Sequence, residues 1–157
     1  MTTRLLTNLI VIHCAATDDS QDIGAAEIDR WHKQRGFDRI GYHFVIRRNG
    51  RIEKGRGLYD RGAHAGGHDR KAVGDMAVAY NDRSIGICMV GGVEADDDMK
   101  ARDNFTVEQW ATLRALVETM LTIFPSAQVI GHREIAIVPK ACPSFDVQAW
   151  KIKVGIG

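Results

Sequence analysis

The sequence contains few cysteines, and their spacing argues against a disulfide-stabilised fold. Cys14, Cys88 and Cys142 are odd in number and form no Cys-x-x-Cys pair. Disulfide frameworks are built from evenly paired cysteines in small secreted chains. Each cysteine is therefore interpreted alone, either as a small buried residue or as a ligand.

A long hydrophobic run is also missing. The apolar stretch near the N-terminus, Leu9 to Ile12, is far too short for the core of a signal peptide or for a membrane span. We therefore expect the protein to be made in a cytoplasm and to make no membrane contact.

Charge of one sign is not in excess. The 21 basic and 20 acidic residues give a formal net charge of +1. This balance forces no strongly basic face, so direct nucleic-acid binding is not expected. The chain of 157 residues, 45% hydrophobic and 26% charged, has the composition of one soluble globular domain. No exposed apolar stripe is evident, and we expect a monomer.

Short apolar runs predict five strands. Asn49-Gly50 lies between the second and third runs, and this pair is a strong signal for a β-hairpin. The runs are Leu9–Ile12, Tyr42–Arg47, Arg51–Lys54, Ser84–Val90 and Gln128–Ile130.

Three segments predict helices. The clearest begins at Thr106, which forms a capping box with Gln109, and it ends before Pro125. Another covers roughly residues 24–35, with Asp22 as its N-cap and Gly36 at its C′ position, and a short one follows Pro143. Strands separated by helices indicate an α/β fold, with a central mixed sheet of about five strands and helices packed on both faces. The apolar stripe of the long helix is predicted to contain Val107, Trp110, Leu113, Val117, Met120, Leu121 and Phe124.

The segment from Gly55 to Asp82 has no hydrophobic period and is rich in Gly, Asp, Arg and His. We predict a long surface loop. Loops of this length in compact domains are usually functional or mobile.

Three residues are candidate metal ligands: His13, His132 and Cys142. Each histidine lies just past the end of a predicted strand, and strand ends are places where polar groups converge in a cleft. Two imidazoles and one thiolate would leave the fourth tetrahedral position of a catalytic zinc open for water. The other interpretation is two ordinary loop histidines and a buried thiol, and spacing alone leaves both open.

Lys140 and Tyr42 are candidate catalytic residues. Lys140 precedes Cys142 by two positions, so both could reach one site, where an ammonium could stabilise an oxyanion. The Tyr42 phenol, after Gly41, could serve as a proton relay or an oxyanion donor. A solvated loop lysine and a core aromatic are the alternatives.

Six motifs then occur in order along the chain, from about Leu9 to Trp150. Together they resemble the type-2 N-acetylmuramoyl-L-alanine amidases, whose fold is shared with peptidoglycan recognition proteins, and in particular the small amidase-type lysozymes (endolysins) of phages. The motifs are Ile12-His13-Cys14-Ala15-Ala16-Thr17, Ile40-Gly41-Tyr42-His43-Phe44, Gly62-Ala63-His64-Ala65, Asn81-Asp82-Arg83-Ser84-Ile85-Gly86-Ile87, Gly131-His132-Arg133-Glu134 and Pro139-Lys140-Ala141-Cys142-Pro143-Ser144-Phe145-Asp146.

The resemblance implies a single amidase domain over residues 1–157, with its core at about 9–150. It implies zinc bound by His13, His132 and Cys142, with Tyr42 and Lys140 as the catalytic pair, and leaves open which of the two donates the proton. The implied reaction is hydrolysis of the amide between N-acetylmuramic acid and L-alanine in peptidoglycan. It also implies a substrate contact for His64, a structural or capping role for Asp146, and a turn formed by Asn81 and Ser84 ahead of the central strand.

One departure from the family pattern lies between His64 and Tyr80. This segment is about a dozen residues longer than in the compact phage relatives, a range in which surface insertions cost little free energy. It contains His68 and Asp69. The insertion would change the rim of the groove or simply extend a loop.

The biological setting implied by the resemblance is a phage enzyme for host cell lysis. It would be made in the host cytoplasm and would reach the periplasmic wall after a separate protein breaches the membrane. Relatives of this kind also bind the phage RNA polymerase, although no residue here indicates that contact.

Two other functions are compatible with the fold. Cytosolic bacterial amidases recycle wall fragments, but they often carry Asp where this chain has Cys142. Non-catalytic peptidoglycan-binding modules usually lack the Cys ligand or the catalytic Tyr, and both residues are present here.

Overall fold

The computed structural model describes residues 2–66, 79–97, 100–137 and 140–157. The centre of the predicted 55–82 loop, including His68 and Asp69 of the proposed insertion, lies outside the described residues. The described flanks of this loop end in a short 3-10 helix at Tyr80–Asp82.

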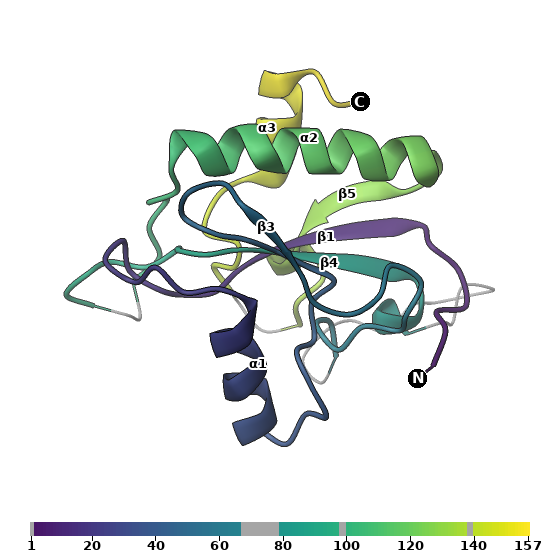
Figure 1. Ribbon diagram of the computed structural model, residues 1–157. Coiled ribbons are helices and arrows are strands. Elements are labelled where there is room, and N and C mark those ends of the chain that lie inside the picture. Colours follow the sequence, from purple (N-terminus) through teal and green to yellow (C-terminus); the bar gives the residue numbers. More distant parts are fainter. Residues whose placement is uncertain (1, 67–78, 98–99, 138–139) are drawn as a thin grey trace.

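A five-stranded mixed sheet forms the centre of the molecule, as predicted (Figure 1). The strand order is β3-β2-β4-β1-β5, in which only the β2–β3 pair is antiparallel. That pair is the predicted hairpin, and Gly50 in its turn has φ of +86°, a conformation that glycine adopts without steric cost. The strands are β1 (Leu9–Cys14), β2 (Phe44–Ile46), β3 (Ile52–Lys54), β4 (Ser84–Met89) and β5 (Gln128–Gly131).

Helices cover both faces of the sheet, which confirms the predicted layering (Figure 1). Helix α1 (Ala25–Gln34) lies on one face, and α2 (Val107–Ile123) and α3 (Val147–Val154) lie on the other. Ile10 and Ile12 of β1 pack into the cluster under α2 and α3, whereas the alternate residues Leu9 and Val11 belong to a cluster on the opposite face. Among the described residues, no helix combines the length and apolar character needed to cross a bilayer.

Helix α2 begins with the predicted capping box. The Thr106 side chain accepts a hydrogen bond from the Gln109 amide at 3.1 Å, and Gln109 accepts one from the Thr106 amide at 3.0 Å. The predicted apolar stripe was wrong at one position, because Val107 in the first turn is 81% exposed. Leu116 is buried instead, beside the predicted core residues Leu113, Val117 and Met120.

The predicted N-cap of α1 was wrong. Gly24, not Asp22, occupies that position, and the Glu27 side chain accepts from the Gly24 amide at 2.9 Å. Glu53 of β3 accepts from the Ala25 amide at 2.8 Å, so a distant strand satisfies an amide at the start of this helix. Asp22 lies 3.5 Å from Arg47. By contrast, Gly36 follows α1 with φ of +93° and Asp146 caps α3, as predicted.

Candidate active site

The candidate metal ligands come together at one edge of the sheet. His13 lies near the carboxyl end of β1, and His132 directly follows β5, the parallel neighbour of β1. Carboxyl ends of parallel strands meet at a common edge, so the strand pairing alone brings the two imidazoles together. Their ring centroids are 4.5 Å apart.

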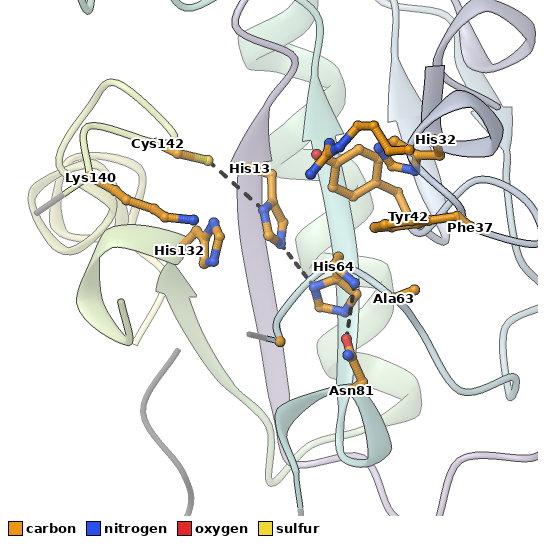
Figure 2. A pocket seen from close by; sticks show the side chains of 12 residues that line it. His13, His32, Phe37, Tyr42, Ala63, His64, Asn81, His132, Lys140 and Cys142 are labelled. Atoms are coloured by element: carbon orange, nitrogen blue, oxygen red, sulfur yellow. Dashed lines mark hydrogen bonds between the residues drawn. The ribbon is translucent and has the colours of Figure 1, made fainter. Parts of the chain in front are cut away.

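Cys142 completes this group from the loop before α3. Ligand atoms of His13, His132 and Cys142 all lie within 4.8 Å of one another, and the Cys142 Sγ is 3.9 Å from His13 Nδ1 (Figure 2). The loop is fixed at this distance by two backbone contacts. The Cys14 amide donates to the Cys142 Sγ at 3.4 Å, and the Arg133 amide donates to the Cys142 carbonyl at 2.8 Å.

The environment of the three side chains suits a metal cation. Burial, the neighbouring imidazoles of His64 and His132, and the Lys140 side chain hold the pKa of His13 well below its usual range, so its imidazole is neutral and has a free lone pair. The Cys14 thiol and burial raise the pKa of Cys142 well above its usual range. Binding of a cation would therefore have to displace a proton from this sulfur.

These residues line a cavity of about 490 Å³. The wall of this cavity also contains Tyr42, Lys140 and His64, so the structure brings all six predicted site residues together. Lys140 is exposed at the rim, whereas His13 and His132 are buried at the base.

Tyr42 stands directly beside the candidate ligands. Its ring centroid is 5.1 Å from that of His13 and 5.4 Å from that of His32 on α1. Burial and the nearby Cys88 and Cys142 raise the pKa of the phenol well above its usual range. Tyr42 therefore keeps its proton at neutral pH and can act as a donor.

His64 is buried in the site and contacts a candidate ligand. It is 9% exposed, and its Nδ1 is 2.9 Å from His13 Nε2. Ser84 Oγ lies 3.2 Å from its other ring nitrogen. His64 thus lines the cavity and at the same time contacts a candidate ligand (Figure 2).

Sequence reasoning did not assign His32, Arg35 and Phe37 to the site, although all three line the cavity. His32 lies on α1, and its Nδ1 accepts from the Gly41 amide at 2.8 Å. Arg35, at the end of the same helix, lies over the Phe37 ring at 5.3 Å. The available signal was a histidine and an arginine, His32 and Arg35, near the end of a predicted helix, and it indicated no particular chemistry.

His43 packs against His64, with ring centroids 5.8 Å apart. It directly precedes β2, is fully buried, accepts from the Gly86 amide at 3.0 Å and lies 2.8 Å from the Asp60 carbonyl. Because that carbonyl only accepts, the second ring nitrogen must be the donor, and the ring is neutral. Burial lowers the pKa of His43 to about 4.

This shift predicts a loss of stability in mild acid. Between about pH 6.5, the usual histidine pKa, and 4, the unfolded chain binds a proton at His43 that the native chain does not bind. The free energy of unfolding should therefore fall by about 2 kcal/mol from pH 7 to pH 5 through this residue. His13 and His64 have lowered pKa values and act in the same direction.

Urea unfolding with a chelator present, at pH 7 and at pH 5, measures this effect. The variant His43→Gln has no titrating group at this position and should lose less stability over the same interval. Equal or greater stability of the natural protein at pH 5 would contradict the prediction.

The sequence is similar to a known protein family and to several phage proteins. The family described as N-acetylmuramoyl-L-alanine amidase matches residues 3–145. The endolysin of Escherichia phage T7 is 44% identical over 144 residues, which cover 92% of this chain and 85% of the phage protein. The endolysin of Enterobacteria phage T3 is 43% identical over 147 residues, covering 94% and 87%.

A solved structure shows a similar fold. The endolysin N-acetylmuramoyl-L-alanine amidase LysCS from Clostridium intestinale URNW superposes with a TM-score of 0.73 at 27% identity, covering 96% of this chain and 85% of that chain. The span matched by the family includes all six candidate site residues, from His13 to Cys142.

Proposed function

Because this chain belongs to the N-acetylmuramoyl-L-alanine amidase family, we propose that it is a zinc-dependent hydrolase of bacterial peptidoglycan. The bond cleaved is the amide between the lactyl group of N-acetylmuramic acid and L-alanine. The observation that carries this proposal is the convergence of His13, His132 and Cys142 at the base of a cavity that also contains Tyr42 and Lys140.

The donor set fits zinc. Two imidazole nitrogens and one thiolate sulfur are ligands that Zn²⁺ prefers, and three protein ligands leave one tetrahedral position free, as in catalytic sites. Zinc held by these residues would supply Lewis-acid chemistry, lowering the pKa of water and polarising an amide carbonyl.

Lys140 supplies a positive charge at the rim of the site. It is close enough to His13 to contribute to the lowered pKa of that imidazole. When the amide carbonyl is attacked, negative charge develops on its oxygen, and the Lys140 ammonium is in the cavity wall to stabilise that charge.

Tyr42 is assigned the proton transfer to the leaving group. The raised pKa of its phenol keeps the O–H intact at neutral pH, so the hydroxyl can donate to the nitrogen of the leaving alanine while it takes up the proton released by the attacking water. In this assignment the Lys140 ammonium stabilises the oxyanion, and the neutral Tyr42 hydroxyl protonates the leaving group.

The biological role that we propose is lysis of a bacterial host by a phage. The endolysin relatives support this setting. The protein would be made in the host cytoplasm and would act on the periplasmic wall once a separate protein has breached the membrane. A contact with the phage RNA polymerase stays a prediction, and a pull-down with the cognate polymerase tests it.

Digestion of purified sacculi tests the reaction. We expect new free amino groups on L-alanine, no new reducing sugar ends, and about one zinc per chain by metal analysis. Removal of zinc by a chelator should abolish the release, and added zinc should restore it. New reducing ends without new alanine termini would exclude amidase chemistry, and full activity without zinc would exclude the metal. Soluble anhydro-muropeptides as the preferred substrate would indicate a recycling enzyme instead.

A further inference from the structure

A buried polar cluster next to the candidate metal site has no role in the mechanism above. His64, Ser84 and Asn81 are all buried. Asn81 and Ser84 each form a hydrogen bond with His64, and His64 in turn contacts His13. Ionisable and polar side chains are placed in such positions only where their hydrogen bonds are satisfied. The donor and the acceptor in each of these hydrogen bonds can be assigned by starting from a backbone carbonyl, which can only accept.

That group is the backbone carbonyl of Tyr80. Ser84 Oγ lies 2.5 Å from it, so the serine hydroxyl donates its only proton there. The same oxygen is 3.2 Å from His64 Nε2 and must accept in that contact. His64 therefore carries its proton on Nε2, and its Nδ1 has a free lone pair.

The same reasoning assigns the donor in the contact between His64 and the candidate ligand His13. Two nitrogens without a proton do not attract each other, so the 2.9 Å contact requires His13 Nε2 to donate to His64 Nδ1. A neutral imidazole has a single N–H, which leaves His13 Nδ1 unprotonated. This is the atom that lies 3.9 Å from the Cys142 sulfur (Figure 2).

The segment from Asn81 to Gly86 holds His64 in place. Asn81 Oδ1 accepts from the His64 and Ala65 amides, both at 2.9 Å, which fixes the backbone. Gly86 of β4 makes room for the ring: a Cβ at this position would lie 2.6 Å from His64 Cγ. All three contacts thus position the same histidine. Asn81 holds the His64 backbone, Ser84 contacts its ring nitrogen, and Gly86 leaves space for its ring.

We propose that His64 is a positioning residue that sets the tautomer and orientation of His13 for metal binding. In this proposal, Asn81, Ser84 and Gly86 hold His64 in the required position. This proposal rests on the proposed function, because it assigns His64 a task toward the zinc site. Outer hydrogen-bond partners of metal-binding histidines hold the ring and raise its basicity, and their loss typically lowers metal affinity about 10- to 100-fold.

Zinc affinity of His64 variants tests the proposal. His64→Leu removes the acceptor for His13, and we expect zinc to bind about 10- to 100-fold more weakly. His64→Asn restores an acceptor oxygen near the position of Nδ1 and should recover most of that affinity. Equal zinc affinity of His64→Leu and the natural protein would overturn the proposal, and a raised KM with unchanged zinc affinity would make His64 a substrate contact instead.

A control separates this effect from general destabilisation. Gln109 is fully buried in α2, where its side chain donates to the Ile46 and Val90 carbonyls and it is not in the cavity wall. Gln109→Leu should therefore lose stability but keep its zinc affinity. If it loses as much affinity as His64→Leu, the positioning role is wrong.

A second measurement needs no variant. Long-range ¹⁵N–¹H NMR correlations of the histidine rings in the natural protein should show His13 and His64 both protonated on Nε2. A proton on His64 Nδ1 would overturn the proposal. If the natural protein bound no zinc at all, the proposed function would fail, while the NMR result would still decide the hydrogen-bond directions.

Discussion

Replacing Cys142 with serine should remove most of the bound zinc and nearly all amidase activity. The sulfur is one of three ligand atoms within 4.8 Å of one another, and a serine hydroxyl at this position is a much poorer zinc ligand than a thiolate. We expect zinc to bind more than about 100-fold more weakly, beyond the usual effect of losing an outer hydrogen-bond partner. Metal analysis after dialysis and competition with a chromogenic chelator measure this loss.

Cys14→Ala is the matched control for that experiment. Cys14 lies beside Cys142, but it contributes its backbone amide, which alanine retains, and its sulfur is not part of the ligand group. This variant should keep its zinc. Cys142→Ser with natural zinc affinity, or loss of zinc from Cys14→Ala but not from Cys142→Ser, would show that the ligand has been assigned to the wrong cysteine.

Replacing Lys140 with alanine should lower kcat by about 10²- to 10³-fold, or about 2.7–4 kcal/mol of barrier, while zinc stays bound. The ammonium is not within the ligand group, so its loss leaves the three ligands in place. Its charge acts on the oxyanion, which exists only as the carbonyl is attacked, and the loss should therefore appear in kcat more than in KM. Steady-state release of alanine amino groups, measured together with zinc content, checks both statements.

Lys153→Ala provides the comparison for Lys140. Lys153 is an exposed lysine on α3, outside the site cavity, and its removal should change activity less than about twofold. A Lys140→Ala enzyme that keeps its zinc and loses less than about tenfold in rate, equivalent to about 1.4 kcal/mol, would be incompatible with the role assigned to this residue.

Local sequence signals predicted the parts of the fold that depend on neighbouring residues. The capping box at Thr106 and Gln109 joins residues three apart, so the pattern contains the whole interaction. The N-cap of α1 was predicted incorrectly because the acceptor for the Ala25 amide is Glu53, 28 residues away. Val107 was predicted as core from its hydrophobicity, although the first turn of α2 leaves it exposed.

For the candidate site, the sequence supplied residue types, their order and their places at strand ends. These were enough to predict that His13 and His132 converge, because parallel strands align their carboxyl ends. His64 was predicted only as a substrate contact, since its hydrogen bond to His13 joins residues 51 positions apart. Nothing in the sequence indicated that Ser84 and Gly86 face the same ring.

The sequence by itself determined the strands, the long helix and the set of side chains able to bind a metal, because periodicity, capping and ligand chemistry are local properties. Only the tertiary structure decided that the ligand atoms of His13, His132 and Cys142 lie within 4.8 Å of one another, and which nitrogen of His13 faces the sulfur. Those choices depend on hydrogen bonds between segments that are distant in the chain, such as Cys14 with Cys142 and His64 with His13. Such contacts exist only after the sheet has brought the segments together.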